Sequence, residues 1–421
     1  VNEDFATITL SPTTLSATDN VSALGALLVT SAVFKSSSTF VSSDLGISTA
    51  AGSSTVTLLG GGANKNGTAV VTVAMQDAAG NITTQDVTLT VNSVNDAPAG
   101  TNKTIGINED SSYVFATADF GFTDSSDGNA LFGVKITTLP AAGSLLLSGS
   151  AVAVGTTISA ADIAAGNLSF TPVANANGAG YGNFTFQVQD NGGTASGGID
   201  TDASANTITL NVTPVNDAPT LDASKSPALS TQEYIFSGGG DAGVHAPTGA
   251  SPAGSLLVSS LVDLATPSGQ VDNITDIDTA PVVGMGITAL ASGLGTTLWY
   301  TTDGGTTWKW TTNTSDSGGG KGLYGADGLA GGGDDRVLFL GADGNTKIVF
   351  DGGGSGSSAS LANGITFRAW DQSSGTAGGF ATNPSTGGSN SLSSVTDAVQ
   401  VNFTSQGIDL TRLEGGSGLV L

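Results

Sequence analysis

This sequence of 421 residues predicts an all-β fold of three tandem β-sandwich modules. Three observations support it: helical patterning is nearly absent, short alternating runs rich in Val, Ile, Thr and Phe recur, and one strand-ending motif is repeated. The alternating runs are separated by clusters of Gly, Asn, Asp and Ser, which favour turns. Many short, half-buried strands with frequent turns are typical of β-sandwiches.

Period-two alternation marks the clearest strands. The strands that this pattern predicts are Thr55–Leu59, Ala69–Gln76, Asp86–Asn92, Asn183–Gln189, Asn206–Thr213, Ile365–Trp370 and Ala398–Phe403. Alternate side chains in such a run point to opposite faces, so one face is buried and the other is solvated. One short helix is predicted at Ala160–Ala165.

A repeated motif marks the module boundaries. VTLTVNSVNDAP at 87–98 matches ITLNVTPVNDAP at 208–219, which lies 121 residues further on. Each copy is a strand that ends in a proline, which cannot donate to a sheet ladder. The predicted modules are therefore 1–97, 98–218 and 219–421, and the third is about twice the size of an ordinary sandwich because of large glycine-rich insertions.

A second repeat precedes the last strand of each module. Its copies are VAMQD at 73–77, FQVQD at 186–190 and FRAWD at 367–371. In each copy alternate residues are expected to face inward, and the strand ends at an aspartate. These copies support three modules of related construction.

Charge and composition exclude several classes of function. The net charge is −24, and the 35 acidic residues include only four Glu. Such a surface repels nucleic acid, so no nucleic-acid partner is expected. The chain has no cysteine, and no apolar run approaches the length of a membrane span, so we expect no membrane insertion in this segment. Because it begins at Val1, with no initial Met and no signal peptide, we expect a segment of a longer chain. Within that chain we expect the segment to be monomeric.

The motifs resemble those of known surface proteins. The VNDAP joints, INED at 107–110 and FTPVANANGAGYGNFTFQVQD at 170–190 resemble cadherin-like and Ig-like modules of giant bacterial adhesins. This resemblance covers modules one and two. It implies calcium-stiffened extender modules that are exported to the cell surface of Gram-negative bacteria and serve in attachment and biofilm formation.

The third module resembles a different part of such proteins. WYTTDGGTTW at 299–308 and ITFRAWDQSSG at 365–375 look like the calcium-dependent peptide-binding domain of long RTX adhesins. In that family the domain binds the free C-terminal carboxylate of a partner protein, with a bound calcium helping. The resemblance implies, as partner, a C-terminal peptide of a surface protein on a host or neighbouring cell.

Carboxylates are expected to gather where modules meet. Asp77 and Asp96 are expected to converge with Glu109 and Asp110 at the first joint. Asp190 and Asp217 are expected to converge at the second, where Asp222 is a further candidate. Calcium takes six to eight oxygen ligands, which such clusters supply. The alternative is that these aspartates only cap turns. Because the same residue types recur at matching positions, we favour calcium.

Further calcium ligands are predicted in the third module. Asp276 and Asp278 are spaced to bind one ion from one loop, although a charged strand edge is the alternative. Asp334 and Asp335 end a glycine run that partly resembles a calcium nonapeptide, and Asp351 opens another glycine run. Both are expected to lie near Asp371, the last residue of the third FRAWD-type repeat.

Glycine-rich loops are the predicted ligand-binding elements. The loops are 317–321, 330–335 and 351–358. Glycine lets the backbone approach a ligand closely, so Gly352, Gly353 and Gly354, together with Ser373, are predicted to bind the peptide carboxylate. The alternative is that these loops are ordinary flexible surface loops.

Aromatic residues leave a lectin-like alternative open. Trp310 could stack on a sugar ring or on a peptide side chain, whereas core packing is expected for at least two of the neighbouring aromatic residues. Thr301–Trp308 fits the Asp-box hairpin, in which Asp303 accepts hydrogen bonds from turn amides. We therefore expect that segment to be structural.

Catalytic groups are scarce, so no enzyme is predicted. His245 is the only histidine, and neither a serine-nucleophile elbow nor a zinc-protease motif occurs. Three functions remain: a calcium-dependent adhesin fragment that binds C-terminal peptides, a calcium-dependent glycan-binding module, and a purely structural spacer.

Overall fold

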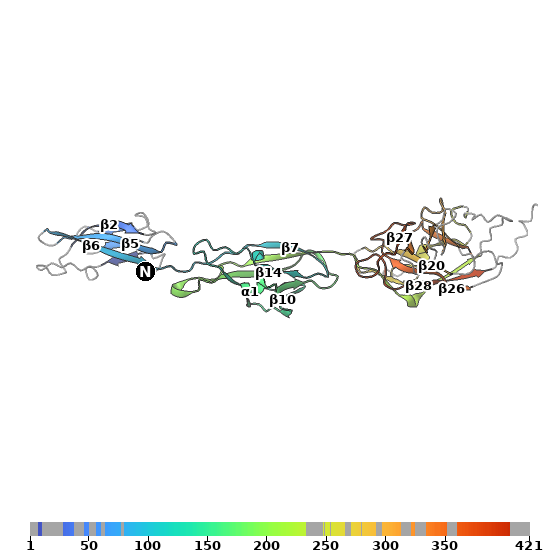
Figure 1. Ribbon diagram of the computed structural model, residues 1–421, viewed down its shortest axis with the longest axis horizontal. Helices are drawn as coiled ribbons and strands as arrows, with labels where there is room; N and C mark the ends of the chain where they lie inside the picture. Colours follow the sequence, from blue (N-terminus) through green and yellow to red (C-terminus); the bar gives the residue numbers. More distant parts are fainter. Residues whose placement is uncertain are drawn as a thin grey trace, which may run out of the picture. The chain divides into compact units, whose positions relative to one another are not determined.

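The chain forms an almost entirely β structure, which confirms the predicted fold class. The computed structural model describes residues 7–10, 28–37, 46–49, 56–59, 64–76, 80–232, 247, 249–252, 254–265, 271–278, 280–291, 297–312, 321–324, 334–351 and 360–404. Two compact units divide the chain, Val1–Pro214 and Val215–Leu421 (Figure 1). The predicted boundary after residue 218 lies close to this division. The predicted boundary after residue 97 falls inside the first unit, between two separate hydrophobic cores.

The N-terminal part of the first unit contains two three-stranded sheets. One has the order β1 (Thr7–Leu10), β4 (Val56–Leu59), β3 (Gly46–Thr49), and the other β2 (Leu28–Ser37), β5 (Gly67–Gln76), β6 (Ile82–Val91). Strand β5 alternates strictly, so that Val71, Val73 and Met75 are buried in the core. This pattern is the one that a sheet with one buried face requires.

The second module follows within the same unit and is a sandwich of two sheets. The larger sheet has the order β12 (Thr157–Ser159), β9 (Leu131–Ile136), β14 (Gly178–Asp190), β15 (Asn206–Thr213), β7 (Lys103–Asn108). The smaller has the order β11 (Ser150–Ala151), β10 (Ser144–Leu147), β13 (Leu168–Thr171), β8 (Tyr113–Val114). Short helices are η2 (Thr117–Phe120), α1 (Ala160–Ala164) and η3 (Ala195–Gly197).

Aromatic side chains fill the core of the second module. Phe115 packs edge-to-face on Phe184 with ring centroids 5.6 Å apart, and Phe120 packs likewise on Phe186 at 5.0 Å. Phe120, Phe184 and Phe186 are fully buried. Full burial of one such side chain contributes about 1.5–3 kcal/mol, so this cluster is a main source of the module's stability.

The second unit is also a two-sheet sandwich. Its larger sheet has the order β17 (Ala228–Gln232), β28 (Asp397–Thr404), β26 (Ser360–Trp370), β20 (Gly284–Leu290), β24 (Arg336–Gly341), β27 (Phe380–Thr382). The facing sheet has the order β18 (Leu256–Leu257), β25 (Lys347–Asp351), β21 (Thr297–Thr301), β22 (Lys309–Thr312), β23 (Lys321–Gly322). Outside them lie the pair β16 (Thr220–Leu221) with β19 (Ile274–Thr275) and the short helices η4 (Ala223–Lys225) and η5 (Val258–Ser260).

The two sandwiches share one strand order. In the second module the first strand β7 pairs in parallel with the last strand β15, which continues to β14, β9 and β12. In the second unit β17 pairs in parallel with β28, which continues to β26, β20 and β24. Because β14 and β26 occupy the same place, each carries its aspartate, Asp190 or Asp371, to the end of the sandwich where the chain enters it.

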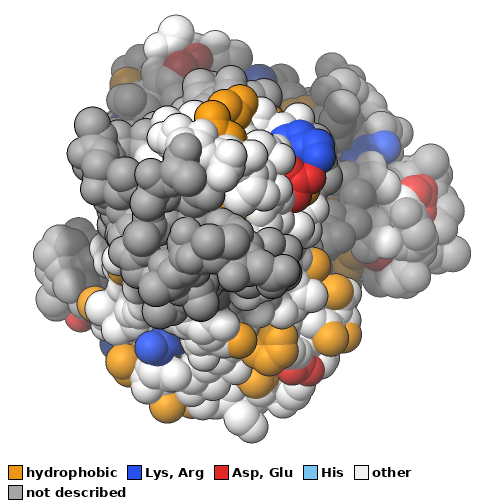
Figure 2. All heavy atoms as spheres, turned by 90° about the vertical axis from the view of Figure 1, so that its left-hand side faces the viewer, with side chains coloured by type: hydrophobic (Ala, Val, Ile, Leu, Met, Phe, Trp, Pro, Cys, Tyr) orange, Lys and Arg blue, Asp and Glu red, His pale blue; other side chains and the backbone are white. Residues whose placement is uncertain are grey.

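The predicted strands correspond to β4, β5, β6, β14, β15, β26 and β28, and the predicted helix to α1. Helix α1 begins after Ser159, whose hydroxyl accepts a hydrogen bond from the backbone N–H of Asp162. The described surface seen in Figure 2 is mostly backbone and uncharged polar side chains, with hydrophobic groups in small scattered patches. No helix among the described residues is long and apolar enough to cross a membrane.

Candidate metal centre

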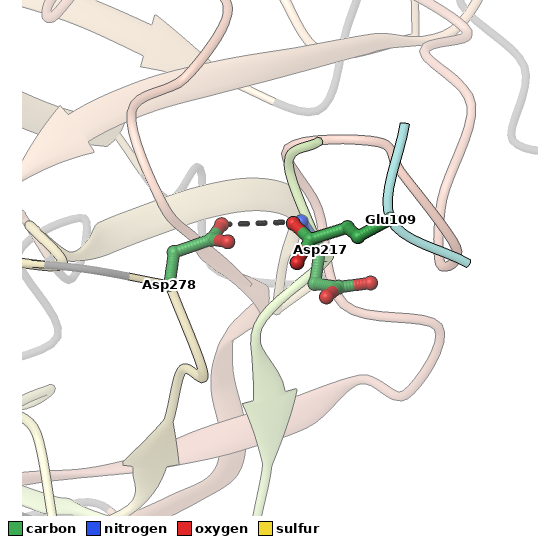
Figure 3. A group of neighbouring side chains, drawn as sticks. All are labelled: Glu109, Asp217 and Asp278. Atoms are coloured by element: carbon green, nitrogen blue, oxygen red, sulfur yellow. Dashed lines mark hydrogen bonds between the residues drawn. The ribbon is translucent and has the colours of Figure 1, made fainter. Parts of the chain in front are cut away.

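Three polar side chains and one backbone N–H form hydrogen bonds at the entrance end of the second unit. The Asn216 side-chain amide donates to Asp371 Oδ2 at 2.9 Å. The backbone N–H of Asp217 donates to Asp278 Oδ2 at 3.1 Å (Figure 3). Asp371 is only 6% exposed, and its Oδ1 accepts from the backbone N–H of Ser373 at 2.7 Å. The VND linker, residues 215–217, is therefore hydrogen-bonded both to the residue that follows β26 and to the loop after β19.

Asp276 adds a carboxylate to this cluster. Its Oδ1 accepts from the backbone N–H of Asp278 at 3.0 Å, whereas its Oδ2 is buried and accepts no hydrogen bond within the described structure. Burial raises the pKa of Asp276, and the charges of Asp278, Asp371 and Asp217 raise it further. A buried, uncompensated oxygen among like charges is destabilised unless a cation or a proton compensates it.

The second module carries the same arrangement at its own entrance end. The Asn95 side-chain amide donates to Asp190 Oδ1 at 3.0 Å and to the backbone carbonyl of Ile199 at 2.7 Å. The backbone N–H of Asp96 donates to Asp127 Oδ2 at 2.6 Å. Asp190 is 2% exposed and also accepts from the next-but-one backbone N–H, that of Gly192, at 2.8 Å.

The two arrangements correspond residue by residue. In each, an asparagine amide binds the strand-end aspartate, and the next backbone N–H binds an aspartate from a loop. The corresponding residues are Asn95 and Asn216, Asp96 and Asp217, Asp127 and Asp278, and Asp190 and Asp371. Such recurrence in two separate sandwiches means that the geometry belongs to the shared fold rather than to one loop.

Sequence reasoning missed three members of these clusters: Asn95, Asn216 and Asp127. The asparagines stand in the repeated VNDAP motif, so the motif itself was the signal that could have identified them. Asp127 had no such signal, because it lies 31 residues after Asp96 whereas Asp278 lies 61 residues after Asp217. The insertions of the second unit thus hide the correspondence.

Asp124 supports the Asp127 loop. Its Oδ1 accepts from the backbone N–H groups of Ser126 and Asp127, and its Oδ2 from that of Asn129. Burial by itself raises the pKa of Asp124, but these backbone hydrogen bonds together lower the pKa further and hold it below its usual value. The side chain therefore orders the loop that presents Asp127.

Glu109 and Asp110 lie at the other end of the second module. The backbone N–H of Glu109 donates to Thr213 at the end of β15, and its buried carboxylate accepts from the Asn177 side chain at 2.8 Å. Asp110 has a positive φ of 57° and accepts from the backbone N–H of Asn175. These residues thus mark the exit end of the module.

The predicted grouping at the joints was therefore wrong in part. Glu109 and Asp110 do not join Asp96, because strand β7 separates the entrance end from the exit end of the sandwich. Asp190 lies at the entrance end with Asn95, away from the exit that leads to Asp217. Because β14 runs antiparallel to β15, Asp190 at the end of β14 lies where β15 begins, and not where β15 leads out of the module.

Asp334, Asp335 and Asp351 do not lie near Asp371, contrary to expectation. Asp335 directly precedes β24. The other end of β24, at Gly341, pairs with Gly284 of β20, which also pairs with Trp370 at the end of β26. Asp351 is the last residue of β25 and pairs with Thr297, again at the end away from Asp371. Strand direction therefore places these aspartates at the opposite end of the sandwich.

Ser373 lies beside Asp371, as its hydrogen bond shows, and Trp310 lies on β22. Trp310 packs against Trp299 with ring centroids 6.4 Å apart. Trp299 and Tyr300 are 2% and 3% exposed, which confirms core packing for two of the four aromatic residues, whereas Trp310 is half-buried.

The Asp-box segment is the predicted hairpin turn. Asp303 Oδ1 accepts from the Thr301 hydroxyl at 2.6 Å and from the backbone N–H of Thr307 at 2.9 Å. Gly305 has a φ of 101°, and a Cβ there would lie 2.5 Å from the backbone of Ala250. Glycine is therefore required for this close approach.

Some predicted residues lie outside the described part of the chain. These are Asp77, His245, Gly352, Gly353 and Gly354. The glycine-rich segments 317–320, 330–333 and 352–358 lie outside it as well.

The donors at the entrance ends fit a hard cation. Each cluster offers carboxylate and amide oxygens, and neither includes a histidine or a thiolate among the residues described. Calcium prefers such oxygen donors, whereas zinc prefers nitrogen and sulfur. The buried Oδ2 of Asp276, which accepts no hydrogen bond among the described residues, is an atom that a bound cation would compensate.

No protein-family model matches the chain, and no curated protein matches it. Among solved structures it is similar to human CDH23 EC21-23, at 12% identity over 89% of this chain and 87% of that one, with a TM-score of 0.39. Mouse cadherin-23 EC22-24 gives 12% identity over 92% and 89%, with a TM-score of 0.40.

Another similar structure is an endo-fucoidan hydrolase from glycoside hydrolase family 107, at 15% identity and a TM-score of 0.21. This chain spans 39% of the hydrolase's length. Cadherin extracellular repeats thus recur among the solved structures that resemble the chain.

Proposed function

We propose that this chain is part of an extracellular, calcium-dependent adhesin. In this proposal the first two modules are extenders, and the second unit binds the C-terminal peptide of a protein on another cell surface. Attachment of cells and biofilm growth would follow from that binding.

The recurring entrance-end cluster is the observation that supports calcium dependence. In both sandwiches a linker asparagine donates its side-chain amide to the strand-end aspartate, and the next backbone N–H donates to an aspartate from a loop. In the second unit the pKa of Asp276 is raised by burial and by three neighbouring carboxylates. A divalent ion would turn that repulsion into attraction and would fix the linker against the sandwich.

Calcium titration by isothermal calorimetry tests this step. Asp371→Asn removes a buried oxygen charge from the cluster of the second unit and is expected to weaken calcium binding there by roughly tenfold or more. Asp222→Asn is the matched control, because Asp222 caps helix η4 through Ser224 and takes no part in the cluster. Absence of calcium binding in the unmodified chain would reject calcium dependence, and equal binding by both variants would reject the Asp371 cluster as the site.

Peptide binding is supported by the resemblance of WYTTDGGTTW and ITFRAWDQSSG to a peptide-binding domain. Ser373, within the second motif, donates its backbone N–H to Asp371, so that motif is physically joined to the candidate calcium cluster. A cation with an open coordination position can bind a carboxylate, and a free peptide C-terminus carries one.

Glycan binding is the second candidate, and Trp310 is the observation that favours it. Its indole is half-buried on β22, which leaves part of the ring available for stacking on a sugar. Arrays of C-terminal peptides and of glycans, each read with calcium and with chelator, separate the two functions. Binding of peptides with a free carboxylate but not of their C-terminal amides supports our proposal, whereas binding of sugars alone overturns it.

A further inference from the structure

The second module joins its first strand to its last. Strand β7 runs parallel to β15 over six residue pairs, from Lys103 opposite Ile208 to Asn108 opposite Thr213. The chain enters the module just before β7 and leaves it just after β15. Tension along the chain therefore pulls these two strands in opposite directions, along their own length.

Side chains secure the entrance end of this pair. The Asn102 side-chain oxygen accepts from the backbone N–H of Thr207 at 2.7 Å. Asp202, which is 6% exposed, accepts from the backbone N–H of Gly100 at 2.8 Å and from the Asn206 side chain at 2.7 Å. Segments 100–102 and 202–207 are thus joined before the ladder begins.

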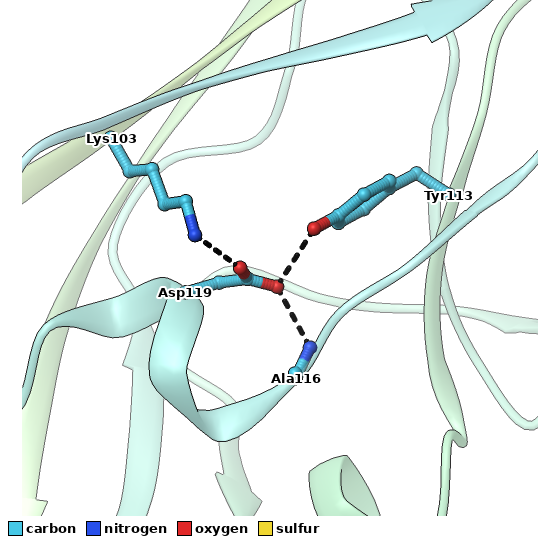
Figure 4. A network of polar contacts seen from close by, with 4 residues as sticks. All are labelled: Lys103, Tyr113, Ala116 and Asp119. Atoms are coloured by element: carbon cyan, nitrogen blue, oxygen red, sulfur yellow. Dashed lines mark hydrogen bonds and ion pairs between the residues drawn. The ribbon is translucent and has the colours of Figure 1, made fainter.

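Lys103, the first residue of β7, is fixed separately (Figure 4). Its ammonium lies 2.6 Å from Asp119 Oδ1, and Asp119 is 4% exposed. The other oxygen of Asp119 accepts from the Tyr113 hydroxyl at 3.1 Å and from the backbone N–H of Ala116 at 2.8 Å. Hydrogen bonding to Asp119 raises the pKa of Lys103 above its usual value.

Two hydrogen bonds close the exit end. The backbone N–H of Glu109 donates to the carbonyl of Thr213 at 2.9 Å, and the Thr213 hydroxyl donates to the carbonyl of Ile107 at 3.1 Å. The parallel ladder is thus bracketed at both ends by contacts that hold the first strand to the last.

We propose that the second module is a force-resisting element, in which the β7–β15 pair must shear as a unit before the module can unfold under tension. In shear, the rungs of the ladder share the load and fail together, whereas in peeling they fail one after another. The contacts of Asn102, Lys103 and Asp202 add to the shear resistance because all three lie where β7 is loaded first.

The second unit repeats this construction with other residues. Strand β17 runs parallel to β28 over five residue pairs. The Ser226 hydroxyl donates to Asp397 Oδ1 at 2.6 Å, and the backbone N–H of Gln400 donates to the carbonyl of Pro227 at 3.1 Å, both at the start of the pair. Both sandwiches therefore oppose tension in the same way, by a mechanism separate from calcium binding at the linkers.

Single-molecule force spectroscopy tests the proposal by changing the direction of pull. The chain has no cysteine, so Ala205→Cys supplies a unique thiol handle beside the start of β15. Pulling between the N-terminus and residue 205 peels β7 from β15, whereas pulling between the two termini shears them. The shear force is expected to be at least about twofold higher, because six pairs resist together. Equal forces in the two geometries would overturn the proposal.

Two variants test the contacts at the start of β7. Lys103→Met and Asn102→Ala are each expected to lower the shear force of one unfolding event. Lys135→Met is the matched control, because Lys135 is an exposed lysine on β9, away from the loaded pair. An equal loss of shear force in Lys135→Met, or an unchanged shear force in the other two variants, would overturn the assignment.

Discussion

At the scale of single residues, Asp276 shows how a candidate metal ligand differs from an ordinary surface aspartate. Its Oδ2 is buried and accepts no hydrogen bond in the described structure, and Asp217, Asp278 and Asp371 raise its pKa further after burial. The residue therefore costs stability when it is ionised and alone, and contributes stability when a cation is bound.

The Asp276→Asn variant is therefore expected to have opposite effects in two buffers. In chelator it raises the free energy of unfolding by about 1 kcal/mol, because a partly screened repulsion between nearby carboxylates is removed. In millimolar calcium it lowers the melting temperature relative to the unmodified chain, because a ligand is lost. Thermal melts in both buffers measure this reversal, and a shift of the same sign in both would contradict it.

Asp303 is an aspartate of the opposite kind. Hydrogen bonds from the Thr301 hydroxyl and from the backbone N–H of Thr307 hold its pKa well below the usual value of 3.8. Because the folded pKa is depressed, the ionised carboxylate contributes stability above pH 3.8, and this is lost as the pH falls through the folded pKa.

We expect Asp303→Asn to be less stable than the unmodified chain at pH 7. The difference should stay constant down to about pH 5 and shrink below about pH 3.8, where the reference carboxyl becomes protonated in the unfolded chain. Urea unfolding in chelator across this range measures it. A difference that grew at low pH would show that the turn is held by something other than this carboxylate.

At the scale of elements, turns are as strictly specified as strands. The chain enters β10 through Gly143, which has a φ of 75°, and a Cβ there would lie 2.4 Å from the ring of Phe170 and 2.8 Å from the carbonyl of Thr171. Gly149, between β10 and β11, has a similar φ of 78° but nothing within 4 Å. A side chain at Gly143 would therefore meet both backbone strain and a steric clash, whereas a side chain at Gly149 would meet backbone strain alone.

Gly143→Ala is expected to destabilise the second module by about 2–4 kcal/mol, from backbone strain together with overpacking of the core. Gly149→Ala, which introduces only the backbone strain, should cost about 1 kcal/mol. Urea unfolding of both variants measures the difference. Equal losses would mean that Phe170 can move aside.

Elements also show where sequence patterns succeed and where they fail. The alternation in β5, β14 and β15 is visible because one face of each strand is buried. Two-residue strands such as β16 and β19 have no period of their own, and only pairing with each other defines them. That pairing places Asp276 and Asp278 beside the VND linker, so the cluster was not readable from strand patterns.

At the scale of the whole molecule, the two compact units have separate cores. Phe186 is fully buried in the core of the second module and contacts Phe120 at 5.0 Å. A cavity made there is confined to the first unit, because no residue of the second unit belongs to that core cluster.

Phe186→Ala is therefore expected to lower the stability of the second module by about 3–5 kcal/mol. Differential scanning calorimetry in saturating calcium should show one transition moved to lower temperature, with the transition of the second unit in place. A single transition that moves as a whole would instead mean that the two units unfold cooperatively.

The sequence by itself determined the all-β class, most long strands, the structural role of Asp303 and the acidic excess of 35 carboxylates against 11 basic groups. These follow from local rules, because alternation, turn residues and charge can be read from neighbouring positions. The partners of the carboxylates at the entrance and exit ends were decided by the tertiary structure alone. Parallel pairing of first and last strands places Asp190 and Asp371 at entrance ends and Glu109 at an exit, since strand direction depends on contacts that are distant in sequence.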